Sequence, residues 1–203
     1  MRQTLLFGGL ESIAHNVNRK EANLRFFELG NCYHYDGEKR SAEKVLAPYS
    51  EALHLGLWIT GRRIENSWAH ANEEASVYEL KGYALNVLRR LGIALGQFLV
   101  EDGKNDIFSK SLAVVDRNGK VYLELGLVKK ALLVACDIET EVYYADFNWS
   151  LLMKKLPKKD VSYTEISKFP AVRRDLALLL DAKVTFGEIE RIAFACEKKL
   201  LKR

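Results

Sequence analysis

The residues best suited to bind an anion gather near the C-terminal end of the chain. From Ser167 onward there are nine basic and five acidic residues, whereas the preceding 166 residues carry equal numbers of each. The formal net charge of +4 therefore lies entirely in this last segment. A basic segment can bind the phosphate backbone of a nucleic acid and release its counterions. The alternative interpretation is an ordinary solvated helix face.

The other titratable side chains show no pattern of a catalytic or metal site. The histidines lack metal-ligand spacing, so surface or sheet positions are the simpler interpretation for His15, His34, His54 and His70. The acidic pairs Glu73-Glu74 and Glu101-Asp102 are interpreted as loop or helix-start residues rather than acid/base dyads. The sequence contains no glycine-rich phosphate-binding motif and no Gly-x-Ser-x-Gly nucleophile motif.

The composition is typical of a globular protein, with 48% apolar and 29% charged residues. No run of roughly 18 apolar residues and no signal-peptide pattern occurs, so we expect a cytoplasmic protein that makes no membrane contact. Cys32, Cys136 and Cys196 lie far apart and form no C-x-x-C motif. We interpret them as reduced thiols packed like small apolar groups.

The elements that must position these side chains mix helices with antiparallel strands. Apolar stripes predict helices over residues 4–18 and 77–91, and Ser76 with Glu79 predicts a capping box for the second. Asn118-Gly119 predicts a hairpin turn. Strand patterns cover residues 24–35, 53–60, 111–116, 121–128 and 141–147, with a short helix over 148–155. Hairpins with short connections favour an α+β fold with an antiparallel sheet over a doubly wound parallel one.

The last segment predicts a strand over Leu176–Leu180 and a helix over Thr185–Leu201 that starts with a Thr185–Glu188 capping box. One strand and one helix cannot cover both faces of that strand, and a unit of this size is too small to be stable alone. We therefore expect one of three outcomes: the segment packs against the first unit, is domain-swapped with another copy of the chain, or is loosely ordered.

Short motifs in collinear order resemble one known family over essentially the whole chain. They are Leu5-Leu6-Phe7-Gly8-Gly9-Leu10-Glu11, Asn16-Val17-Asn18-Arg19, Phe26-Phe27-Glu28-Leu29-Gly30, Val77-Tyr78-Glu79-Leu80-Lys81-Gly82, Leu91-Gly92-Ile93 and Phe169-Pro170-Ala171-Val172-Arg173-Arg174-Asp175-Leu176. Together they are similar to the beta chain of bacterial phenylalanyl-tRNA synthetase. The last of them resembles the start of the ferredoxin-fold anticodon-binding domain that ends that chain.

The resemblance implies three parts: a class II synthetase-like module over residues 1–156, a linker over 157–168, and the truncated start of a ferredoxin-like domain, a βα piece, over 169–203. It implies a heterotetramer in which an alpha subunit activates phenylalanine with ATP and magnesium. No cofactor is expected in this part of the enzyme. The implied partners are the alpha subunit and phenylalanine tRNA, and the candidate tRNA-binding residues are Lys168, Arg173, Arg174 and Lys183.

The arginines that hold ATP in class II synthetases are missing from this pattern. Such arginines bind the triphosphate and offset charge as the adenylate forms. Arg25 and Glu28 have suitable types but stand three residues apart, so they face opposite sides of a strand. His34 stands where the alternative register needs an arginine, and Lys129-Lys130 follow the strand that should precede a Glu-Arg pair. We therefore predict no catalytic residue in this module and no activity of the chain alone.

Three questions stay open at this point. The apolar helices over 4–18 and 77–91 either face the alpha subunit or line the module's own core, and the core is favoured for 77–91. Arg174 either contacts tRNA or pairs with Asp175 or another nearby acid. The alternative functions are a freestanding interaction domain derived from a synthetase fold and a catalytic class II ligase with displaced ATP ligands.

Overall fold

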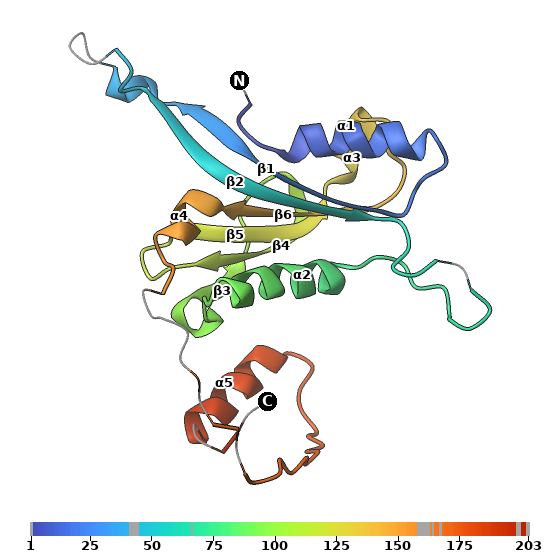
Figure 1. Cartoon of the computed structure of the whole chain (residues 1–203), viewed down its shortest axis with the longest axis vertical. Helices are drawn as coiled ribbons and strands as arrows, with labels where there is room; N and C mark the ends of the chain where they lie inside the picture. Colours follow the sequence, from blue (N-terminus) through green and yellow to red (C-terminus); the bar gives the residue numbers. More distant parts are fainter. Residues whose placement is uncertain are drawn as a thin grey trace. The chain divides into compact units, whose positions relative to one another are not determined.

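Figure 1 shows the computed structural model of the chain. The structure describes residues 2–40, 45–65, 67–157, 163, 165–166, 168–197 and 200–201. Contacts between Cα atoms divide the chain into two compact units, Met1–Lys159 and Asp160–Arg203, and each is described by itself. No described helix combines the length and the apolar character needed to span a membrane.

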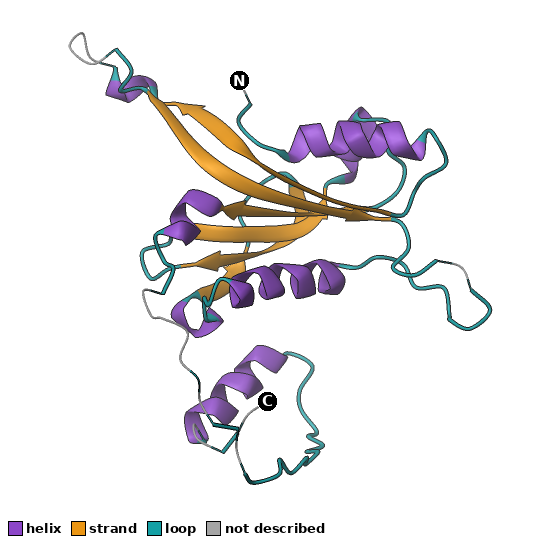
Figure 2. Cartoon of the chain, in the orientation of Figure 1, coloured by secondary structure: helices purple, strands orange, loops and turns teal. Residues whose placement is uncertain are grey.

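A six-stranded antiparallel sheet forms the framework of the first unit (Figure 2). Its strand order is β1-β2-β6-β5-β4-β3. The strands are β1 (Leu24–Tyr35), β2 (Tyr49–Thr60), β3 (Leu99–Asp102), β4 (Phe108–Val115), β5 (Val121–Val128) and β6 (Val142–Asn148). The predicted antiparallel sheet is confirmed. The short edge strand β3 was not predicted, because its four exposed residues carry no alternation that marks a buried face.

Helices cover both faces of this sheet (Figure 1). They are α1 (Leu6–Val17), α2 (Val77–Arg90), α3 (Lys130–Ala135) and α4 (Trp149–Met153), with 3-10 turns at Gly37–Lys39 and Leu95–Gln97. Adjacent residues of β2 point to opposite faces: Trp58 joins the core beneath α1 and α3, and Ile59 joins the core beneath α2 and α4. The sheet thus separates two apolar cores.

The apolar stripes of the long helices are used inside the module. Leu80, Ala84 and Leu88 of α2 are buried against the sheet, which confirms that residues 77–91 line the module's own core. Leu10 and Ile13 of α1 are buried in the same way on the other face. Neither stripe is therefore available to a partner.

The β4–β5 hairpin turns as predicted at Asn118-Gly119, with one difference in its backbone. Only Gly119 has a positive φ, of 74°. The carboxylate of Asp116 accepts hydrogen bonds from the backbone N–H groups of Asn118 and Lys120, at 2.9 and 3.0 Å. These bonds stabilise a longer turn than a two-residue loop with two positive φ angles.

The described residues of the second unit form one helix, α5 (Phe186–Cys196). The capping box at its start is confirmed, since the backbone N–H of Thr185 donates to the Glu188 carboxylate at 2.8 Å. The predicted strand Leu176–Leu180 is not formed, and the described residues of this unit include no strand and no buried residue. A strand needs a neighbour for its backbone groups, and no strand among the described residues of this unit pairs with Leu176–Leu180.

Candidate functional site

The four candidate tRNA-binding residues all lie exposed in the second unit, before α5. Among the described residues, no hydrogen bond or ion pair joins any two of the side chains of Lys168, Arg173, Arg174 and Lys183. Asp175 pairs with Arg173, at 3.6 Å between Nε and Oδ1, so both possibilities for Arg174, tRNA contact or pairing with an acid, stay predictions. Both side chains of that pair are about nine-tenths exposed, so it is held weakly.

On β1, the two residues considered as ATP ligands, Arg25 and Glu28, form ion pairs within the protein. Arg25 points to the α2 side of the sheet, where its Nη2 lies 3.1 Å from Oε1 of Glu79 in the first turn of α2. Glu28 points to the α1 side and pairs with Arg2. The expectation that Arg25 and Glu28 face opposite sides is confirmed. His34 is exposed near the end of the same strand.

Two strands of the sheet run into helices, and neither junction holds a Glu-Arg pair. β5 leads through Lys129 into α3, which begins at Lys130. β6 leads into α4, which begins Trp149-Ser150-Leu151. The side chain of Asn148 caps α4 by accepting from the N–H of Leu151. Both junctions therefore lack a guanidinium that could bind a phosphate.

Histidines and cysteines form no metal centre in the described part of the chain. His54 on β2 lies 2.8 Å from Asp146 on β6, Nδ1 to Oδ1, so this pair ties two neighbouring strands. Cys32 is buried, and burial raises the pKa of its thiol, which keeps it protonated. Cys196 is exposed, so the interpretation of all three cysteines as packed groups is wrong for this one.

An apolar groove lies beside the edge strand β1, on the α2 face of the sheet. It encloses about 710 Å³. Its floor is formed by Leu57 and Ile59 of β2, and one wall by Val87 and Leu91 at the end of α2. The remaining lining residues are Arg25, Phe26, Phe27, Trp58, Tyr83, Asn86, Arg90 and Trp149.

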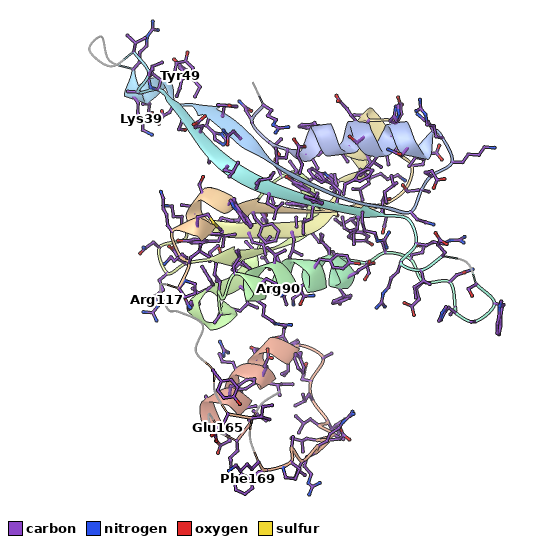
Figure 3. The ribbon with its side chains drawn as sticks, viewed as in Figure 1. Lys39, Tyr49, Arg90, Arg117, Glu165 and Phe169 are labelled. Carbon is purple, nitrogen blue, oxygen red and sulfur yellow. The ribbon has the colours of Figure 1, made fainter. Side chains whose placement is uncertain are left out.

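The rim of this groove carries an aromatic ring and two cationic groups. Phe27 of β1 is 77% exposed, although its partner in the sheet, Leu57, is partly buried and packs against the core on this face. Arg25 is occupied by Glu79, whereas Arg90, near the end of α2 in Figure 3, makes no ion pair with a described residue. Apolar lining beside Arg90, which has no acidic partner among the described residues, suits a protein segment better than a phosphate ligand.

The sequence reasoning missed this groove. Its walls come from β1, β2, α2 and α4, and Arg25 stands 54 residues before Glu79. The available signal was the alternation along β1: Phe27 and Leu29 are apolar on the face that also carries Arg25. That signal identifies a strand face but not what covers it.

Comparison with known proteins shows which family the fold belongs to. Residues 1–149 match the family described as the phenylalanyl tRNA synthetase beta chain CLM domain. The whole chain is 62% identical to the phenylalanine–tRNA ligase beta subunit of Bacteroides fragilis and 45% identical to that of Porphyromonas gingivalis. It spans 25% of the length of each of these relatives.

A solved structure shows a similar fold. Pyrrolysyl-tRNA synthetase from Desulfitobacterium hafniense superposes with a TM-score of 0.53 at 18% identity, over 76% of this chain and 49% of that one. The likeness shows a class II synthetase-like sheet. The chain belongs to the phenylalanyl-tRNA synthetase beta chain family, and its residues 1–149 carry the CLM domain of that family.

Proposed function

We propose that this chain is a non-catalytic part of the beta subunit of phenylalanine–tRNA ligase, in which it supports the catalytic alpha subunit and tRNA binding during phenylalanyl-tRNA formation. The observation that carries the proposal is the ion pair between Arg25 and Glu79. The Arg25 guanidinium is held by Glu79 on the α2 side of the sheet, while Glu28 is held by Arg2 on the other. An arginine tied to a carboxylate in this way is not available to a triphosphate.

On this proposal ATP and magnesium act on the alpha subunit, and this chain holds neither. Three carboxylates of the described sheet and α2 already have partners: Glu79 pairs with Arg25, Glu28 pairs with Arg2, and Asp146 lies 2.8 Å from Nδ1 of His54. The module's contribution is a rigid sheet with two packed faces. The proposed location is the cytoplasm, where tRNA is charged.

Phenylalanine-dependent exchange of pyrophosphate into ATP tests the lack of activity. The chain alone, with phenylalanine, ATP and magnesium, is expected to show no exchange above blank. A complete phenylalanine–tRNA ligase of alpha and beta subunits serves as the positive control. Exchange by this chain alone would overturn the proposal and favour a ligase with displaced ATP ligands.

A titration with phenylalanine tRNA tests the role of the second unit. We expect weak binding or none, because the four basic side chains lie exposed and no hydrogen bond or ion pair among the described residues joins any two of them. A variant with glutamate at four positions should bind tRNA as weakly as the unchanged chain. The replaced residues are Lys168, Arg173, Arg174 and Lys183. Sub-micromolar, salt-sensitive binding that this variant loses would contradict the expectation.

A further inference from the structure

The strand β1 lies at one edge of the sheet, and the direction of its backbone groups can be assigned. The N–H of Tyr33 donates to the carbonyl of Arg2, on the side away from β2. The N–H of Asp36 donates to the carbonyl of Pro48, on the side of the β1–β2 hairpin. Backbone groups alternate in direction along a strand, so the odd-numbered residues of β1 point outward.

Part of this edge is already paired. The segment at Arg2 covers it near Tyr33, and the Arg2 side chain also donates to the carbonyl of Asn31. Nothing in the described part of the chain pairs with the outward backbone groups of Phe27 and Leu29. An exposed stretch of unpaired strand edge is a template for another strand.

The free edge and the apolar groove adjoin each other. Phe27 and Leu29 point to the groove's face of the sheet and are 77% and 51% exposed. A strand added beside β1 would extend the row formed by Phe27 and Leu57, and every second side chain of it would cover this apolar surface. A helix or a small ligand would cover the groove but leave the edge unpaired.

We propose that Arg25–Leu29 of β1 and the adjoining groove bind an extended segment of a partner protein, by addition of a strand to the sheet. The segment is apolar at alternate positions and carries a carboxylate that pairs with Arg90. Backbone hydrogen bonds supply affinity in this mode, and the side chains facing the groove supply selectivity. The inference concerns partner binding and does not depend on the proposed lack of activity.

A second copy of this chain is a poorer occupant. Two β1 edges could pair only around Phe27, because each edge is closed at Tyr33 by its own Arg2 segment. Such pairing would also bring together two rims that each carry Arg90, which makes no ion pair with a described residue. Like charges across an interface oppose association, whereas an acidic segment is attracted.

An NMR titration of the ¹⁵N-labelled chain tests the proposal. The probe is the peptide acetyl-Val-Thr-Val-Thr-Glu-Thr-amide, which places two valines and the glutamate on one face of a strand. We expect saturable shifts, with a millimolar dissociation constant, at the amides of Arg25, Phe27 and Leu29. A peptide with the same side chains but methylated backbone nitrogens should not bind, because it cannot donate to the edge.

Matched variants distinguish binding at the groove from non-specific binding of the peptide. Phe27→Asp should weaken binding at least tenfold, and Phe7→Asp, at a half-exposed position on α1, should leave it unchanged. Both variants are checked for native amide spectra before titration. No saturable shifts at residues 25–29, or equal binding of the methylated peptide, would overturn the proposal. Sedimentation that shows a dimer dissolved by Phe27→Asp would assign the edge to a second copy and overturn it too.

Discussion

The indole ring of Trp58 lies directly against α1 at Gly9. A Cβ atom on Gly9 would overlap Cε2, Nε1 and Cζ2 of that ring. Trp58 is 1% exposed and packs against Tyr144, with ring centroids 5.0 Å apart. The close approach of α1 to the sheet therefore depends on the absence of a side chain at Gly9.

Replacing this glycine should loosen the helix from the sheet. We expect Gly9→Ala to lower the free energy of unfolding by about 1–3 kcal/mol, because Trp58 is packed on all sides and cannot move aside freely. The loss should outweigh the gain in helix propensity of roughly 1 kcal/mol. Urea unfolding followed by circular dichroism measures the difference.

The neighbouring glycine is the matched control for this effect. A Cβ on Gly8 would lie 3.8 Å from the Glu28 carboxylate, an ordinary contact, and Gly8 is exposed. Gly8→Ala should be neutral or stabilising by up to about 1 kcal/mol. Equal stabilities of the two variants would show that Trp58 does not restrict Gly9.

The ion pair between Arg25 and Glu79 should stabilise the fold measurably. The Glu79 side chain is 8% exposed and that of Arg25 is 29% exposed. Arg25→Met leaves a nearly buried carboxylate without its cation, so we expect a loss of about 1–3 kcal/mol in urea unfolding. Adding Glu79→Gln to that variant should recover part of the loss, because the buried charge is then removed.

An exposed pair of the same type serves as the control. Arg63 and Glu73 are joined at 2.9 Å, but their side chains are 57% and 50% exposed. Arg63→Met should change the free energy of unfolding by less than about 0.5 kcal/mol. If Arg63→Met lowers the free energy of unfolding as much as Arg25→Met does, burial does not explain how strongly the Arg25–Glu79 pair stabilises the fold.

The positive φ of Gly119 predicts a local cost for any side chain in the β4–β5 turn. An L-residue at this φ is strained, so Gly119→Ala should destabilise the protein by about 1 kcal/mol. Gly96→Ala is the control, because that glycine lacks a positive φ and has open space around its Cβ. A neutral Gly119→Ala in thermal unfolding would contradict the turn geometry.

Asp116 should make the stability of the same turn depend on pH. The backbone N–H groups of Lys120 and Asn118 hold the pKa of its carboxyl below the usual range, together with the hydroxyl of Tyr122. A carboxyl with a lowered folded pKa stabilises the protein above its unfolded pKa, and this contribution is lost as pH falls through the folded value. We therefore expect the loss below about pH 4.

Two measurements check this expectation. The carboxyl carbon of Asp116 should titrate below the usual aspartate range in NMR spectra. Asp116→Asn should remove the part of the acid-induced fall in Tm that comes from this group. A normal titration of Asp116 would contradict the assigned hydrogen bonds.

Local patterns in the sequence predict much of the first unit. The strand over residues 24–35, predicted from its Phe and Tyr content, and the capping box of Ser76 and Glu79 depend on residues close together in the sequence, and both are confirmed. The bounds of α2 agree within one residue of the predicted 77–91. The predicted strand Leu176–Leu180 fails for the opposite reason: apolar alternation marks a strand only when another strand pairs with it.

The sequence by itself determined the antiparallel α+β module, because apolar periodicity and short turns mark its helices and hairpins. The spacing of Arg25 and Glu28 likewise predicts that the two do not bind ATP together, and this stays a prediction. Only the tertiary structure decided that Arg25 pairs with Glu79, that Trp58 packs against Gly9, and that Phe27 borders an open groove. These contacts join residues about 50 positions apart on different elements. Periodicity fixes which face of an element is apolar, but packing decides which element covers that face.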